Sequence, residues 1–296
     1  MFVKQLARIE RREARIRRIR TRLSHEQRLH SERVGSTPRE HHHIGISQNQ
    51  YEHIGTFLRK NDGDPAIRVQ RPLQMIPRSA NATVYQNFFP KLKRHLIPRI
   101  LSKLHLPGVT STDQSDTSNH INPSSVVFQR DRIYPHHVIR INYTTYDVRR
   151  SQDVVNASTQ HCNIMLLADP TGVSDSDSAS DHPFRYARVI GVYHANVVYT
   201  GPGMIDYQPH RLEFLWVRWY RTVDSRSTGW GTRKLDRLQF AHMAEDDAFG
   251  FVDPSDILRS CHIIPAFASG KLHADGKGLS CCAQDSLDWG AYYVNR

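Results

Sequence analysis

The chain has 296 residues, and its 40 Lys and Arg against 29 Asp and Glu give a formal charge of +11 before its 18 His are considered. With 39% hydrophobic and 23% charged residues, the composition is typical of a soluble globular protein and excludes a collagen-like chain. No apolar run reaches the roughly 18–20 residues of a membrane-spanning helix, and the arginine-rich start excludes a secretory signal. The four Cys are predicted to be free thiols, since a disulfide scaffold would need more in a chain of this length.

The positive charge is concentrated at the start of the chain. Residues 1–33 hold eleven Lys and Arg against four Glu, a net +7, so the other 263 residues carry only +4. Apolar residues recur at helical spacing, which predicts a basic amphipathic helix. The arginines predicted to contact nucleic-acid phosphates, through their planar forked geometry, are Arg8, Arg11, Arg12, Arg15, Arg17, Arg18 and Arg22. Nuclear import, a solvated arm without a partner, a short coiled coil and a membrane-surface helix are the other interpretations.

Two further helices are expected before a polar linker. A short one over 47–60 has Ser47 as its N-cap, and the apolar stripe from Phe88 to Leu104 predicts a second, with a kink at Pro98. The run His41–His43 is predicted to be solvated and not to bind a metal, because adjacent side chains cannot all face one ion. The predicted domain boundaries are 1–34 for the basic arm, 35–106 for the helical segment with an insertion at 67–86, 107–125 for the linker and 126–296 for the β domain.

The residues after the linker are predicted to form β-strands. Runs rich in β-branched and aromatic residues at 138–146, 186–198 and 212–223, separated by turn residues, predict a mainly antiparallel β-barrel. The predicted fold class is therefore α+β: a basic N-terminal helix and a helical segment, followed by a barrel. Because the chain ends on the apolar run at 292–294, the barrel is expected to be truncated at its C-terminus.

The strand over 212–221 is apolar on both faces in its middle, so both faces are expected to be covered. The side chains assigned to the barrel interior are Leu215, Val217 and Trp219. On the opposite face, Trp216 and Tyr220 flank Arg218, which makes these three a candidate groove for a histone tail or another peptide. Packing of this face into the core is the preferred interpretation, and the groove is the alternative.

The residues do not predict a catalytic centre, a metal site or a cofactor. Cys261 and His262 are neighbours on a predicted strand and point to opposite faces, as do Cys281 and Cys282, so neither pair can readily share a metal ion. The competing interpretation is a metal-dependent nuclease or transposase, which needs carboxylates at strand ends. The acids that follow predicted strands are Asp147, Asp224, Glu245, Asp246 and Asp247.

The β region resembles a bromo-adjacent-homology (BAH) module in the order of its motifs. The matching stretches are 186–191, 215–221, 247–252, 256–258 and 261–264. This resemblance implies a β-barrel that binds protein or nucleosome surfaces and has no catalytic activity. The same stretch is similar to the domain that follows the transposase in plant CACTA-type elements.

Residues 43–296 also resemble the C-terminal part of transposon-derived proteins repeated in mushroom genomes, of the Plavaka or Kyakuja–Dileera–Zisupton kind. The stretches that carry the resemblance are 43–45, 64–65, 90–93, 140–150 and 262–267. The segment 67–86 departs from that pattern and is interpreted as a retained intron. The resemblance implies a nuclear, non-catalytic accessory region that tethers to nucleic acid or chromatin. A fragment of a metal-dependent DNA transposase or nuclease is the alternative; no membrane or small-molecule partner is predicted.

Overall fold

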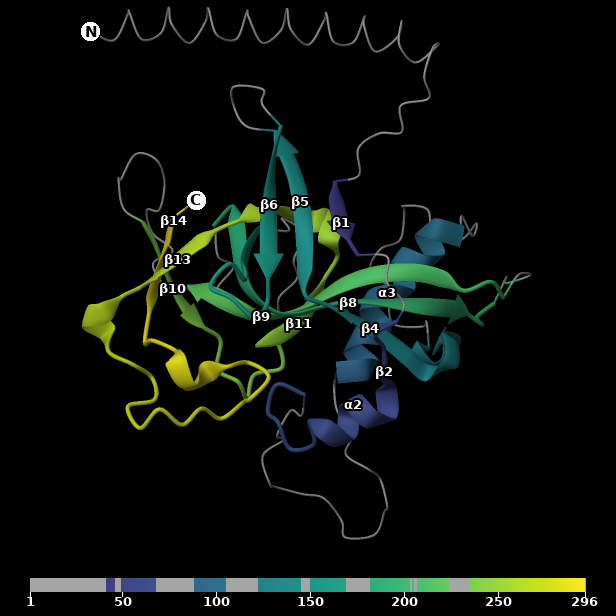
Figure 1. The fold of residues 1–296 in the computed structure, drawn as a ribbon, viewed down its shortest axis with the longest axis horizontal. Coiled ribbons are helices and arrows are strands. Elements are labelled where there is room, and N and C mark those ends of the chain that lie inside the picture. Colours follow the sequence, from purple (N-terminus) through teal and green to yellow (C-terminus); the bar gives the residue numbers. More distant parts are fainter. Residues whose placement is uncertain are drawn as a thin grey trace, which may run out of the picture. The chain divides into compact units, whose positions relative to one another are not determined.

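The computed structural model describes residues 41–45, 49–67, 88–104, 122–144, 150–168, 182–202, 204, 207–223 and 235–295 (Figure 1). The basic arm, most of the predicted linker and nearly all of the predicted insertion therefore lie outside the described residues. The chain divides into a large unit, His42–Ile141 with Asp153–Arg296, and a small one, Met1–His41 with Asn142–Gln152. The packing described below belongs to the large unit.

The described part of the chain is built mostly of strands. The strands are β1 (His42–Ile44), β2 (Glu52–His53), β3 (Val126–Phe128), β4 (Arg132–His136), β5 (Val138–Thr144), β6 (Arg150–Asn156), β7 (Asn163–Leu167), β8 (Phe184–Tyr199), β9 (His210–Thr222), β10 (Asp236–Phe240), β11 (Phe249–Val252), β12 (Ile257–Ser260), β13 (His262–Pro265) and β14 (Tyr292–Asn295). The α-helices are α2 (Ile54–Lys60) and α3 (Phe88–Leu104), and the 3₁₀ turns are η1 (Pro123–Ser125), η2 (Gln129–Asp131), η3 (Pro254–Asp256), η4 (Phe267–Ser269) and η5 (Asp285–Leu287).

The main sheet has β8 and β9 at its centre. Its order is β12-β7-β8-β9-β10-β14-β13; β11 adds to β9, β3 and β4 add to β8, and β2 adds to β4. A separate sheet has the order β1-β5-β6. In Figure 1, β8 and β9 are the two long green strands that run across the middle of the picture.

The predicted barrel and the predicted α+β class are wrong. The fold is mainly β, and within the described residues the strands form open sheets without a closed barrel. The physical reason lies in β8, which has 16 residues and uses one edge for several short partners. β7 occupies that edge first, then β4, then β3. The path of paired strands ends at β12 and β13, which do not pair with each other in the described structure.

The long β8–β9 pairing contains one irregularity. The register shifts between Val189 and Gly191, which is the signature of a β-bulge. Gly191 has space only for a hydrogen, because a Cβ there would collide with the ring of Tyr193. The glycine thus allows the aromatic ring to lie across the backbone at the bend.

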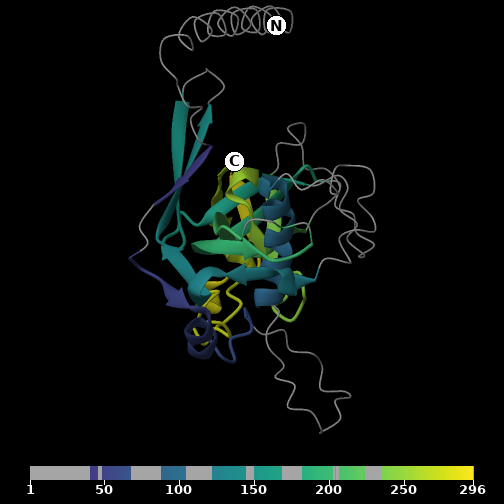
Figure 2. The same cartoon turned by 90° about the vertical axis from the view of Figure 1, so that its right-hand side faces the viewer.

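Both faces of the central strands are covered. On one face, buried residues of α3, among them Leu92, Leu96 and Ile100, pack with Phe214 and Trp216 of β9; Figure 2 shows α3 along that face of the strands. On the other face, a second cluster includes Val189 of β8 with Leu215 and Val217 of β9. The prediction that this strand is covered on both sides is confirmed.

The helical predictions agree with the structure in their main features. The stripe from Phe88 to Leu104 forms one helix with Pro98 inside it, whereas the first helix is shorter than expected, Ile54–Lys60. The expected cap, Ser47, lies outside the described residues. Because the helices share a core with β9, they stabilise the sheet directly.

Candidate functional site

The residues predicted to bind nucleic acid and those predicted to bind a peptide fall in very different places. The seven arginines from Arg8 to Arg22 lie outside the described residues. Trp216, Arg218 and Tyr220 are interior, with exposed fractions of 2%, 4% and 7%. The three share one face of β9, as the alternation predicts, but other parts of the chain cover that face. The structure presents no groove at these side chains for a peptide.

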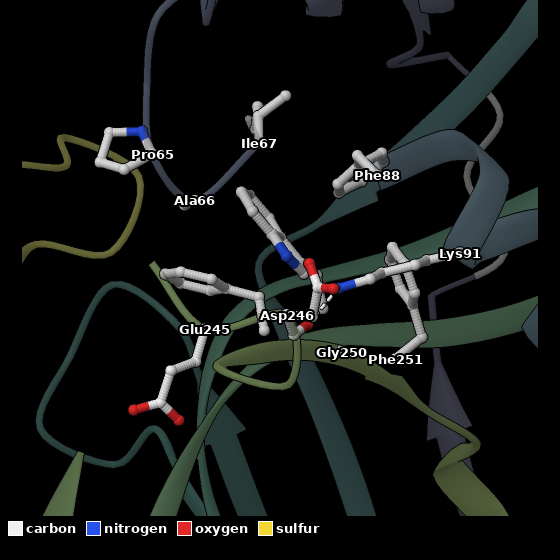
Figure 3. Close-up of a pocket in the computed structure, with 11 residues that line it drawn as sticks. Pro65, Ala66, Ile67, Phe88, Lys91, Glu245, Asp246, Gly250 and Phe251 are labelled. Carbon is white, nitrogen blue, oxygen red and sulfur yellow. Dashed lines mark hydrogen bonds between the residues drawn. The ribbon is translucent and has the colours of Figure 1, made fainter. Parts of the chain in front are cut away.

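Trp216 lines a small pocket under the N-terminal end of α3 (Figure 3). Its walls are aromatic: Phe88 meets the Trp216 ring edge-on at 5.0 Å between centroids, and Phe249 and Phe251 complete the lining. The Lys91 ammonium reaches the carbonyl oxygen of Asp246 at one side. The volume of about 20 Å³ admits one water molecule at most. The pocket is therefore a packing defect of the aromatic core and not a ligand site.

Arg218 belongs to a buried ionic cluster that sequence reasoning missed. Its Nη1 donates to Asp288 Oδ2 at 2.6 Å, while Nη1 of Arg188, the residue paired with it on β8, donates to Asp288 Oδ1 at 2.6 Å. Both guanidinium groups lie over the ring of Phe240, and the Tyr292 hydroxyl also donates to Asp288. Burial lowers the pKa of Arg218, against the opposing charge of Asp288. One carboxylate thus fastens the loop before β14 to the centre of the sheet.

A larger hollow lies between α2, α3 and β3. It has a volume of about 440 Å³ and is lined by Ile54, Leu58, Phe89, Pro90, Lys93, Val127, Phe128 and Asp131. Lys93 lies over the ring of Phe128 at 6.0 Å. The backbone of Arg130 and Asp131 adopts positive φ angles of 57° and 55°, which are uncommon in residues other than glycine. This hollow is open and apolar, with one cation and one anion in its lining.

A histidine cluster lies at the crossing of β1, β4, β8 and β9. His42 Nε2 is 3.1 Å from Glu213 Oε2, and His136 Nε2 is 2.6 Å from Nδ1 of the fully buried His194. Burial, and after it the positive charge of Arg211, lower the pKa of His194 to about 3. The pKa of His136 is lowered by the same two causes. His136 and His194 therefore favour the neutral imidazole.

Ser280 does not form a catalytic triad with the described residues around it. Ser280 donates its hydroxyl proton to Asp64 Oδ1 at 2.6 Å and accepts a bond from the Ala283 amide. His273, the nearest imidazole in the same loop, instead contacts Asp285 Oδ2 at 3.0 Å. The serine proton is thus directed at a carboxylate that joins two loops, and this hydroxyl has a structural role.

The acids of the nuclease interpretation do not converge where they can be seen. Asp147 and Asp224 lie outside the described residues, while Glu245 and Asp247 both contact Arg221. Among the residues that the structure describes, no three His, Cys, Asp or Glu side chains are placed to hold a metal ion. No helix in the described ranges is long and apolar enough to cross a membrane.

Many carboxylates of the described part contact basic side chains of the same chain. The pairs are Glu52 with Lys60, Asp153 with Arg259, Glu213 with Arg211, Asp236 with His182, Asp253 with Arg99, Asp285 with His273, Asp288 with Arg188 and Arg218, and Glu245 and Asp247 with Arg221. These acids are therefore already used in holding the fold together.

Comparison with known proteins gives no relative. No family model, no curated protein and no solved structure matches the chain. The resemblance to BAH modules and to transposon-derived proteins therefore stays a prediction.

Proposed function

We propose that the chain is a nucleic-acid-binding protein that acts in the nucleus as a tether, with its basic N-terminal segment contacting phosphates and its mainly β body serving as the folded anchor. The observation that carries the proposal is the distribution of charge. Residues 1–33 have a net +7 out of the total +11. Such a concentration of arginine is typical of segments that neutralise phosphates and release counterions.

The geometry of the body supports an external partner for this charge. In its largest acidic run, 245–247, the carboxylates of Glu245 and Asp247 are engaged by Arg221. The carboxylates of Glu213 and Asp253 are likewise held by Arg211 and by α3. A polyanion such as DNA or RNA is the partner that complements an arginine-rich segment with this net charge.

The test is a titration of the full chain against a fluorescein-labelled 20-base-pair duplex at several salt concentrations. In the test variant, Gln replaces the seven arginines Arg8, Arg11, Arg12, Arg15, Arg17, Arg18 and Arg22; the matched control replaces the same seven with Lys. Neutralisation is expected to weaken binding and to reduce the slope of log affinity against log salt by up to about 6. The Lys control, which keeps the charge, should keep most of that slope.

An unchanged salt slope in the glutamine variant would overturn the proposal, because the phosphate contacts would then lie elsewhere. Equal loss of affinity in the Lys control would assign the effect to the arginine geometry and not to charge alone. The thermal transition of the body should be the same in all three proteins, since none of the seven positions contributes to the described core.

A further inference from the structure

The sheet formed by β10, β14 and β13 has one covered and one open face. Leu238, Tyr292 and Val294 point inward, with exposed fractions of 0%, 3% and 1%. The alternate residues point outward, and the register aligns Arg237, Tyr293 and Ile264 in one row across the three strands. Tyr293 is 37% exposed at the centre of this row.

The outward side chains combine aromatic and basic groups. Those contributed by the strands are Arg237, Gln239, His262, Ile264, Tyr293 and Asn295, and none of them is acidic. Arg237 donates to Ser269 Oγ at 3.2 Å, and no carboxylate pairs with its guanidinium within the described ranges. This contact brings the 3₁₀ turn η4 against the same row.

The turn η4 adds a second exposed ring. Phe267 is 67% exposed and meets Trp289 edge-on, with ring centroids 5.0 Å apart. Lys271 forms an isolated antiparallel β-bridge with Trp289, and its ammonium lies 5.8 Å from the centroid of the Trp289 ring. We call the surface made by Arg237, His262, Ile264, Phe267, Lys271 and Tyr293 the C-terminal face.

We infer that the C-terminal face binds single-stranded nucleic acid, with unpaired bases stacking on Tyr293 and Phe267 and phosphates contacting Arg237 and Lys271. This inference rests on the proposed nucleic-acid-binding function and adds a second, folded site to it. Exposed rings interleaved with cations and free of acids match the chemistry of a base and its phosphate. A duplex hides its base faces in its own stack, so the same rings favour single strands over double strands.

The position of the face fits this use. β13 is the last strand of the sheet, so the row Arg237–Tyr293–Ile264 runs out to a sheet edge with nothing paired beyond it in the described structure. A polymer can therefore enter and leave the face without a closed passage. The ion pairs of Asp288 with Arg188 and Arg218 hold the loop before β14 against the sheet that carries this face.

The test uses the full chain with a fluorescein-labelled 20-nucleotide oligothymidine and the 20-base-pair duplex. Phe267→Ala and Tyr293→Ala should each weaken oligothymidine binding about 10-fold, as the loss of one stacked base does, and leave duplex binding unchanged. Tyr293→Phe keeps the ring and should keep the affinity. The matched control is Tyr207→Ala, which removes a 60% exposed tyrosine from the segment before β9.

A second experiment separates the proposal for the basic segment from the proposal for the C-terminal face. It introduces Phe267→Ala and Tyr293→Ala into the chain in which the seven arginines are changed to Gln. Loss of oligothymidine binding from Phe267→Ala in that background, with duplex binding already gone, supports both. Unchanged oligothymidine affinity in Phe267→Ala and Tyr293→Ala would overturn the C-terminal face and leave the basic segment intact. An unchanged salt slope after arginine neutralisation, together with a loss in Phe267→Ala, would overturn the basic segment alone. Thermal melts of each variant exclude unfolding as the cause.

Discussion

The central β8–β9 hairpin and the C-terminal strands β10, β14 and β13 belong to one sheet. They differ in how many of their two faces are covered by other parts of the chain. In the hairpin, Trp216 and Val217 are neighbours in sequence and both are buried, with exposed fractions of 2% and 0%. In β14, Tyr292 is buried and its neighbour Tyr293 is open. Because both of its faces are covered, the hairpin belongs to the core. The C-terminal strands are covered on one face only, so their other face is exposed and can bind a partner.

The difference also extends to charge. Arg218 of the hairpin is buried and shares a carboxylate with Arg188, whereas Arg237 of the C-terminal strands contacts only a serine hydroxyl among the described side chains. Because a buried charge must be paired, an arginine in the covered region stabilises the fold. An arginine on the open face has no such partner and is available to an anion from outside.

The largest expected effect comes from the residue that joins the two regions. Asp288→Ala leaves the buried guanidinium of Arg218 and the partly buried one of Arg188 without their carboxylate, and should cost about 3–5 kcal/mol of unfolding free energy. Asp275→Ala, at an exposed position of the same loop, should change it by less than about 0.5 kcal/mol. Urea denaturation measures both. Equal midpoints for the two variants would show that Asp288 does not hold the regions together.

The next effect compares one ring from each region. Trp216→Ala should cost about 3–5 kcal/mol, because it opens a cavity in the aromatic core, whereas Tyr293→Ala should cost about 1 kcal/mol. Trp219, which the sequence assigned to the interior, is partly exposed and lies under Arg185 at 4.0 Å, so Trp219→Ala should cost less than Trp216→Ala. A larger loss from Tyr293→Ala than from Trp216→Ala would reverse the comparison.

The last comparison depends on pH. The folded state holds the pKa of His194 at about 3 and that of His95 at about 4 by burial, below the value of about 6.5 in an unfolded chain. At pH values between the folded and unfolded pKa, these histidines are protonated in the unfolded chain but neutral in the folded one. The free energy of unfolding therefore falls as the pH decreases below 6.5. Each histidine contributes up to about 1.4 kcal/mol per pH unit.

Unfolding free energy measured from pH 7 to 4.5 checks this expectation. His194→Gln should flatten the pH dependence, and His262→Gln on the C-terminal face is the matched control. The same flattening in both variants would contradict a contribution specific to the covered region.

Sequence patterns predicted local structure well where periodicity and burial agree. The stripe of α3 and the two-sided apolar run of β9 both appear in the structure, because the spacing of apolar residues follows directly from the element that buries them. The closed barrel was wrong because closure depends on which strands pair, and no local pattern states that β8 has three partners on one edge.

The candidate site was less predictable. The strand alternation correctly placed Trp216, Arg218 and Tyr220 on one face, but it could not tell that α3 and the loop around Asp288 cover that face. Asp288 lies 70 residues from Arg218 and outside any motif. The open face had no local signal either: 292–294 is one apolar run in the sequence, although its buried and exposed positions alternate in the structure.

The shared edge of β8 has a consequence for how this gene can change. A single inserted or deleted codon in the strand would rotate every following side chain to the opposite face. It would also misalign β4 and β3 on one edge and half of β9 on the other. Single substitutions along β8 leave this pairing in place. Insertions or deletions of whole codons are therefore expected only in the loops before and after β8. The spacing between Phe184 and Tyr199 is thus the part of the chain where length, more than identity, is under constraint.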